Sequence, residues 1–170
     1  MQIRRLQAGD FDVFWQLRLK ALKDYPQAFG ASYEEAAVLP PEAAKQRLTN
    51  TETRFVLGAF LDTGELAGMV GFSQESSRKM RHKGFVWGMY VDQPFQGRGI
   101  GRKLLSELFQ IVEAIEEIEL VNLMVVDSNL SAVRLYESMG FKTYATEMNA
   151  MKLDDYTYVN EHLMVKKLER

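Results

Sequence analysis

The sequence of 170 residues contains no cysteine and only two histidines, His82 and His162. Without cysteine there is no disulfide framework, no thiolate metal site and no cysteine nucleophile. Two histidines are too few for a metal centre built from histidine ligands alone. The sequence therefore directs attention to chemistry carried by other groups, and we expect no metal.

Excess positive charge and long apolar runs are also absent. The formal net charge at pH 7 is −2, whereas a general nucleic-acid-binding protein normally carries a basic excess. No apolar run approaches the length of a membrane span, and the first residues lack the apolar core of a signal peptide. We therefore expect no nucleic-acid partner and no membrane partner. A cytoplasmic location is expected.

The composition is typical of one globular domain over residues 1–170. Hydrophobic residues make up 46% of the chain and charged residues 26%, which are ordinary values for a protein with a substantial core. No internal repeat, low-complexity segment or linker divides the sequence.

Hydrophobic periodicity predicts alternating strands and helices. A helix is expected from Asp10 to about Asp24, with an apolar stripe that includes Leu17 or Arg18. Glycine in the segment Asp62-Thr63-Gly64 favours a hairpin turn there. The other expected elements are strands over 1–6, 55–61, 65–73, 83–91, 120–126, 141–148 and 156–167, helices around 41–48, 104–115 and 132–139, an irregular segment over 26–40, and a loop over 149–155.

Residues 96–101, with the sequence QGRGIG, place three glycines at alternate positions between an expected strand and an expected helix. Glycine permits turns whose N–H groups converge, and a helix N-terminus adds partial positive charge, so the segment predicts a phosphate site. A P-loop is excluded because no Lys-Ser or Lys-Thr pair follows Gly101. A dinucleotide-binding motif is excluded because Arg102 stands where its third glycine belongs. The spacing that fits is Q/R-x-x-G-x-G.

A second motif lies downstream of this segment. Asn129 follows the strand-like run 120–126, Tyr136 stands seven residues later, and Gly140-Phe141 ends the following helix. The two motifs together resemble those of the GCN5-related N-acetyltransferase (GNAT) family, and the resemblance covers roughly residues 54–145. It implies an α/β acetyltransferase fold, with a mixed sheet, helices on both faces and the element order β-α-α-β-β-β-α-β-α-β-β.

The resemblance implies that acetyl-CoA is the co-substrate. Its pyrophosphate is expected on the N–H groups of the glycine segment, and its pantetheine arm along the free edge of strand 85–91. The backbone amide of Met89 is the best candidate to stabilise the developing oxyanion. Asn129 is at the same time a favourable helix N-cap. The residues expected to bind acetyl-CoA are Met89, Tyr90, Val91, Gln96, Gly97, Arg98, Gly99, Ile100, Gly101, Arg102 and Asn129.

Two catalytic groups are expected. The resemblance implies that Tyr136 donates a proton to the departing sulfur, since a phenol with a pKa of about 10 stays protonated at neutral pH. The attacking amine must also lose a proton, but Phe85 stands where some relatives carry a glutamate base. Glu75 is the predicted substitute, and Glu34, Glu35 or a water chain to backbone carbonyls are alternatives.

The predicted function is transfer of the acetyl group of acetyl-CoA to a primary amine of a small molecule or peptide. Acetylation of a protein N-terminus or lysine, and a non-catalytic acyl-CoA sensor on the same fold, are alternatives. Aromatic and acidic residues near the acceptor would suit a cationic amine, and the last strand is a candidate for pairing across a homodimer interface. The expected acceptor lining is Tyr25, Phe29, Tyr33, Glu34, Glu35, Trp87 and residues 149–156.

Overall fold

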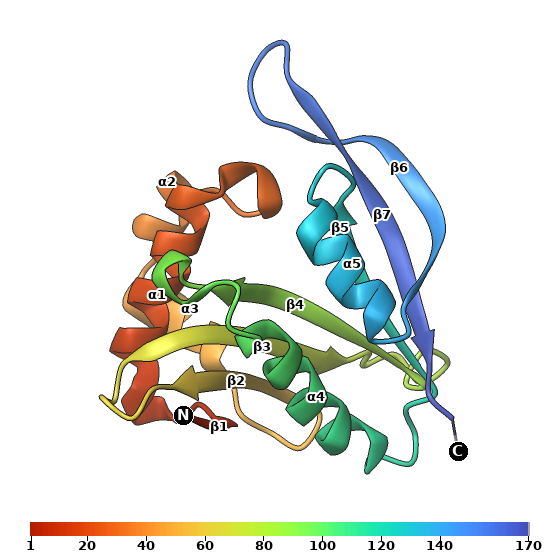
Figure 1. Ribbon diagram of the computed structural model, residues 1–170, viewed down its shortest axis with the longest axis horizontal. Helices are drawn as coiled ribbons and strands as arrows, with labels where there is room; N and C mark the ends of the chain where they lie inside the picture. The colour runs from red at the N-terminus through yellow and green to blue at the C-terminus, as the bar shows by residue number, and fades with distance from the viewer. Residues whose placement is uncertain (170) are drawn as a thin grey trace.

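The computed structural model describes residues 1–169, which form one seven-stranded sheet with helices on both of its faces (Figure 1). The strands are β1 (Gln2–Arg5), β2 (Arg54–Phe60), β3 (Leu66–Gln74), β4 (Lys83–Val91), β5 (Leu120–Val126), β6 (Lys142–Lys152) and β7 (Tyr158–Lys167). The helices are α1 (Phe11–Asp24), α2 (Tyr33–Ala37), α3 (Pro41–Lys45), α4 (Ile100–Glu113) and α5 (Leu130–Ser138). The α/β fold class and the order of the expected elements are confirmed, with α2 as an additional short helix.

The sheet has the order β1-β2-β3-β4-β5-β7-β6, and every neighbouring pair is antiparallel except β4 and β5. These two parallel strands pair only at one end, where Lys83–Phe85 lies opposite Leu120–Asn122. Beyond that point they separate, and Figure 1 shows β5 rising away from β4. The divergence leaves one side of residues 86–91 without a strand partner, as expected for a free strand edge.

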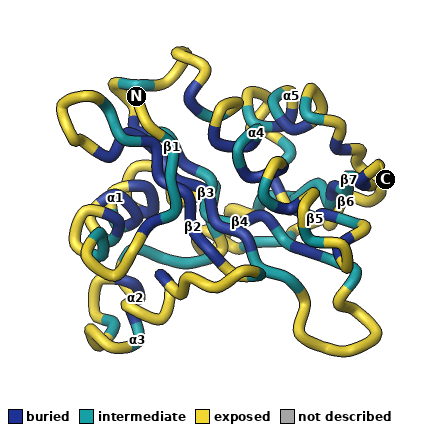
Figure 2. The backbone as a smooth tube through the Cα atoms, turned by 90° about the horizontal axis from the view of Figure 1, so that it is seen from below, coloured by how far each residue is buried: buried dark blue, intermediate teal, exposed yellow. Residues whose placement is uncertain are grey.

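Each face of the sheet carries its own apolar core. On one face, α4 contributes Leu104, Leu105 and Leu108, all fully buried, and Val133 of α5 belongs to the same cluster. The apolar residues of α4 recur three and four positions apart, which places them on one side of the helix. On the other face, α1 packs Phe14 and neighbouring apolar residues against the sheet. Figure 2 shows the buried central strands between α1 on one side and α4 on the other.

Two expectations about local structure are wrong. The segment 26–40 was expected to be irregular, but it contains the helix α2, whose N-cap Ser32 accepts a hydrogen bond from the N–H of Glu35. The expected loop over 149–155 is also displaced, because β6 continues to Lys152 and the connection to β7 covers residues 153–157. Asn149 has φ +55° and lies within a shift of the β6–β7 register between Glu147 and Met151. Asparagine is also typical of turns, so the sequence does not distinguish this strand irregularity from a turn.

The β6–β7 hairpin projects beyond the rest of the sheet (Figure 1). Strand β6 forms the sheet edge, and its side chains are exposed or half-buried along its whole length. Within residues 1–169, every helix is too short or too polar to cross a bilayer.

Candidate active site

A cleft of about 460 Å³ opens where β4 and β5 diverge. One wall is the second half of β4 with the glycine segment, and the other is β5 with the start of α5. The residues that line it and that matter below are Tyr25, Phe29, Trp87, Gly88, Met89, Tyr90, Val91, Gln96, Gly97, Gly99, Ile100, Gly101, Arg102, Asn129 and Tyr136. The cleft therefore joins both motifs that the sequence singles out.

A bulge in β4 shapes the wall of the cleft. In the pairing of β3 with β4, Met69 lies opposite Tyr90 but Gly71 lies opposite Trp87, so two β4 residues stand against the single residue Val70. One of these two is Gly88, whose φ of +61° is accessible to glycine at little cost. The bulge changes the direction of the strand just where it borders the cleft, next to Met89.

The glycine segment presents a row of free backbone donors to the cleft. Gly97 and Gly99 have φ values of +73° and +76°, and a Cβ on either would meet nothing within 4 Å. Their backbone conformation, rather than lack of space, therefore calls for glycine. Within residues 1–169, the N–H groups from Gly97 to Arg102 donate to no protein acceptor, and Lys103 is the first of the helix to find one, on Gly99. Such a row at a helix N-terminus suits an anion.

Gly101 has a different role, because it allows close packing. A Cβ there would lie 3.0 Å from Cε of Met89 and 3.2 Å from Cδ2 of Leu135. The first turn of α4 thus sits directly against β4 and α5, which closes the end of the cleft beneath the free N–H groups.

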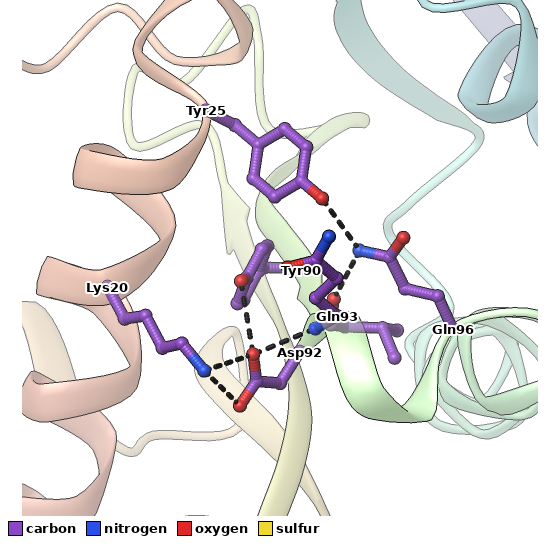
Figure 3. Close-up of polar contacts among 7 residues, drawn as sticks. Lys20, Tyr25, Tyr90, Asp92, Gln93 and Gln96 are labelled. Carbon is purple, nitrogen blue, oxygen red and sulfur yellow. Dashed lines mark hydrogen bonds and ion pairs between the residues drawn. The ribbon is translucent and has the colours of Figure 1, made fainter.

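Polar contacts fix the glycine segment relative to β4 and α1 (Figure 3). The Nε2 of Gln96 donates to the carbonyl of Val91 at 2.9 Å and to the hydroxyl of Tyr25 at 3.4 Å. Asp92 accepts from the N–H of Gln93 at 2.8 Å and holds the 3₁₀ turn that leads into the segment. Gln96 is therefore a positioning residue in this structure, although it also borders the cleft.

The second motif contributes the opposite wall. Asn129 is the N-cap of α5, and its side chain accepts a hydrogen bond from the N–H of Ala132 at 3.2 Å. Tyr136 lies on the same helix and is only 7% exposed, with its ring packed edge-on against Phe141. Burial raises the pKa of the Tyr136 hydroxyl well above its usual value, so the group remains a proton donor. Within residues 1–169, this hydroxyl forms no hydrogen bond, and no unpaired polar side-chain atom is fully buried. The Tyr136 hydroxyl therefore keeps access to solvent, and the residue lines the cleft.

The structure brings together all predicted site residues except Arg98 and Glu75, which do not line the cleft. The Arg98 guanidinium lies 5.5 Å from the ring centre of Phe95. The Arg102 side chain reaches α5 instead and donates to Oγ of Ser138 at 2.8 Å. Glu75 is exposed at the beginning of the β3–β4 loop, and its N–H donates to the carbonyl of Lys83. Its role as a base stays a prediction.

A second cavity of about 380 Å³ lies on the α1 side of the sheet. It shares Phe29, Trp87 and Gly88 with the cleft, so the two spaces meet at the β4 bulge. Of the expected acceptor residues, Tyr25, Phe29 and Trp87 line one or both spaces, whereas Tyr33, Glu34, Glu35 and residues 149–156 line neither. The second cavity therefore has aromatic lining residues, but it lacks the expected Glu34 and Glu35 beside them.

Arginines line the second cavity, and the sequence reasoning assigned them no role there. Arg18, Arg47 and Arg54 all border it. Arg18 could have been identified from the sequence, because it occupies a position in the apolar stripe of α1 and is buried there. Arginine is rarely buried unless it is paired, so its presence at such a position indicates a specific role. Arg47 and Arg54 come from the segment before β2 and the start of β2, and no local pattern marks them.

Comparisons with known proteins agree with this geometry. A model of the acetyltransferase (GNAT) family matches residues 15–141. The spermine/spermidine N(1)-acetyltransferase of Bacillus subtilis (strain 168) is 31% identical over 83 residues, which cover 46% of this chain and 54% of that protein. The N-alpha-acetyltransferase RimI of Mycobacterium tuberculosis is 36% identical over 103 residues, or 61% of each chain. This chain thus matches less than two thirds of the length of either relative.

The same fold occurs in a solved structure. That of yncA from Salmonella typhimurium, described as a putative acetyltransferase with its cofactor acetyl-CoA, superposes with a TM-score of 0.77. The sequences are 22% identical, and the match covers 100% of this chain and 95% of the other.

Proposed function

The chain belongs to the acetyltransferase (GNAT) family, and we propose that it transfers the acetyl group of acetyl-CoA directly to a primary amine. The acceptor is a small molecule or a peptide. The observation that carries this proposal is the row of unpaired N–H groups from Gly97 to Arg102, which lies at one end of the cleft between β4 and β5. Acetyl-CoA combines a pyrophosphate with a long amide-bearing arm, and the cleft offers a binding surface for each.

The proposed binding mode uses the main chain more than the side chains. The free N–H groups of the glycine segment receive the pyrophosphate, as helix N-termini and successive amides do for other anions. The unpaired edge of β4 at Met89, Tyr90 and Val91 pairs with the amides of the pantetheine arm, in the manner of an added strand. Asn129, at the start of α5, borders the same cleft. The choice of cofactor is supported by the structural neighbour yncA, which is described with acetyl-CoA as its cofactor.

The proposed reaction is a single transfer. The amine nitrogen attacks the thioester carbon, the N–C bond forms, and the C–S bond breaks to release CoA. The Tyr136 hydroxyl gives its proton to the departing sulfur, and the N–H of Met89 stabilises the oxygen while it carries negative charge. The amine has an ordinary pKa of about 10.4, so it must shed a proton before it attacks. Glu75 is the proposed base, and a water chain is the alternative.

The expectation that the last strand pairs across a homodimer interface is wrong, because β7 is already paired with β5 on one edge and with β6 on the other. The exposed edge strand is β6, and a second copy of the chain is its proposed partner. Tyr144 and Met148 on this strand are 60% and 69% exposed, and an unpaired apolar edge favours association. Light scattering of the purified protein measures the mass, and a monomer at all concentrations rejects the homodimer. A cytoplasmic location is part of the same proposal, since acetyl-CoA is made and used inside cells, and cell fractionation tests it.

The decisive experiment measures thiol release from acetyl-CoA over a panel of amines. The proposal predicts release with at least one small amine or peptide, together with the acetylated product. Release with protein N-termini or lysines alone would favour the protein-modifying alternative. Binding of CoA without transfer to any amine would identify an acyl-CoA sensor. Failure to bind CoA at millimolar concentration would reject the proposal.

A further inference from the structure

Arg18 is a buried cation without an acidic partner. It lies in the middle of α1 and is 8% exposed. Within residues 1–169, it forms no hydrogen bond or ion pair, and its nearest aromatic contact is Trp87, whose ring centre lies 5.9 Å from the guanidinium carbon. Burial, followed by the charge of Arg47, lowers the pKa of Arg18 to about 10, so the group is still charged at neutral pH. Burying such a charge is costly unless something compensates it.

Arg4, in contrast, has an acidic partner that balances its charge. The two terminal nitrogens of Arg4 donate to the two carboxylate oxygens of Asp10 at 2.7 and 2.8 Å. Arg18 has no such carboxylate, although its guanidinium is the more deeply buried of the two. Because no unpaired polar side-chain atom among the described residues is fully buried, the Arg18 guanidinium keeps contact with the cavity that it lines. A charged donor placed in this way binds an anion through charge-assisted hydrogen bonds.

Arg18 borders the second cavity together with Arg47 and Arg54, and none of the acidic residues that the structure describes lines that cavity. Arg47 and Arg54 are exposed, and neither side chain has an ion pair or a hydrogen bond among the described residues. Three arginine residues thus border one space of about 380 Å³. Guanidinium groups bind carboxylate and phosphoryl oxygens through two parallel hydrogen bonds, and like cations are repelled from such a space.

The cavity also adjoins the place where the acyl group would be held. Nη1 of Arg18 lies 3.4 Å from the position of a Cβ on Gly88, and Gly88 lines the cleft as well as the cavity. A molecule in the cavity with its amine directed toward the β4 bulge would keep its other end among the arginines.

We propose that the acceptor amine also carries an anionic group, carboxylate or phosphoryl, and that Arg18 binds this group together with Arg47 and Arg54. This inference rests on the proposed acetyltransferase function and names its substrate class. It argues against polyamines as acceptors, despite the similarity to the spermine/spermidine enzyme. A polycation would be repelled by the positive charge of the three arginines that line the cavity.

The test compares acceptors that differ in one group. The thiol-release assay is run with an α-amino acid, the corresponding amide, the corresponding aminophosphonate, and spermidine. A charge-assisted contact predicts that kcat/KM for the acid or the phosphonate exceeds that for the amide by about 10-fold to 100-fold. The larger of the two anionic rates identifies the group. A preference for the amide or for spermidine, or equal rates for acid and amide, overturns the inference but leaves the acetyltransferase proposal intact.

Variants assign the preference to Arg18. Arg18→Met should reduce the acid-to-amide ratio to about 1, Arg18→Lys should retain part of it, and the Kd for CoA should stay unchanged. Arg54→Gln, at an exposed position, should reduce the ratio without affecting folding. Arg134→Met removes an exposed arginine of α5 that lines neither space, and it should leave the ratio as in the parent protein. An undiminished ratio in both Arg18→Met and Arg54→Gln overturns the assignment. No transfer to any amine rejects the acetyltransferase proposal itself.

Discussion

The Nζ of Lys20 on α1 lies 2.6 Å from one carboxylate oxygen of Asp92, the residue that directly follows β4. The same carboxylate accepts from the N–H of Gln93 at 2.8 Å and from the hydroxyl of Tyr90 at 3.4 Å (Figure 3). One buried acidic group therefore connects α1, β4 and the turn into the glycine segment. The position of the proposed phosphate site depends on this connection.

The two partners of this ion pair should contribute unequally to stability. Asp92→Ala removes the hydrogen bonds from three donor groups at a buried site and should lower the free energy of unfolding by about 2 kcal/mol. Lys20→Met should lower it by less than about 1 kcal/mol, because the Lys20 side chain is 45% exposed. Urea unfolding of both variants measures the difference. Equal losses would show that the ion pair itself, rather than the turn, holds the segment.

Gly99 should be required for cofactor binding because of its backbone conformation. Gly99→Ala forces a side chain into φ +76°, at a cost of about 1–2 kcal/mol, and should weaken CoA binding by about 10-fold. Gly64→Ala is the matched control, since Gly64 has φ +87° in the β2–β3 hairpin and also has open space around it. Calorimetric titration with CoA compares the two. Similar affinities in both variants would argue against the phosphate site.

Tyr136→Phe should reduce kcat by roughly 100-fold, the usual effect of removing a general acid, with little change in the Kd for CoA. Tyr144→Phe, on the exposed strand β6, is the control and should retain full activity. Because burial raises the pKa of Tyr136, activity should show no loss from ionisation of this group below pH 10. A rate for Tyr136→Phe equal to that of the control would remove the residue from the mechanism.

Burial of Tyr136 also affects stability at high pH. The unfolded chain releases the phenolic proton near pH 10, whereas the folded protein retains it. The free energy of unfolding should therefore fall as the pH rises above about 10.

Glu75 is tested as the base by the variant Glu75→Gln. If Glu75 is the base, kcat/KM of the variant should fall by roughly 100-fold at pH 7. It should recover as the pH approaches the pKa of the acceptor amine, because the amine is then deprotonated without a base. Glu34→Gln and Glu35→Gln serve as the competing variants. Since Glu75 is exposed outside the cleft, unchanged kinetics in all three variants would leave the water chain as the route for the proton.

Two carboxylates face each other in the β6–β7 hairpin, where Glu161 lies directly opposite Glu147. Burial, and then the charge of Glu147, raises the pKa of Glu161. The folded protein thus holds this proton more tightly than the unfolded chain, and the free energy of unfolding falls as the pH rises from about 4.3 through the folded pKa.

Glu161→Gln should remove this loss. It should raise the free energy of unfolding by about 0.5 kcal/mol at pH 7 and change it little at pH 3. Urea unfolding at both pH values, with the exposed Glu52→Gln as control, measures the effect. A gain of the same size at pH 3 would contradict the electrostatic explanation.

Much of the fold was predictable because its signals are local. The apolar spacing of α4, the hairpin glycine Gly64 and the N-cap Asn129 each act within a few residues of themselves. The continuation of β6 past Asn149 was missed, since pairing with β7 supports an irregularity that looks like a turn. The helix α2 was missed because it has only five residues and carries too little periodicity to detect.

The site divides in the same way. The glycine segment and Tyr136 belong to contiguous motifs, and the structure brings them to one cleft. The bulge at Gly88 depends on how β3 pairs with β4, which no local pattern encodes. The arginines of the second cavity come from α1, from the segment before β2 and from β2 itself, so only the folded chain brings them together.

The most direct test of the account is an NMR titration of the amide-labelled protein with CoA. If the main chain of this cleft binds CoA, the largest changes in amide chemical shift should occur at Gly97–Arg102 and along β4 from Gly88 to Val91. Changes confined to other parts of the chain, or none at millimolar CoA, would contradict the claim that these main-chain donors hold the cofactor.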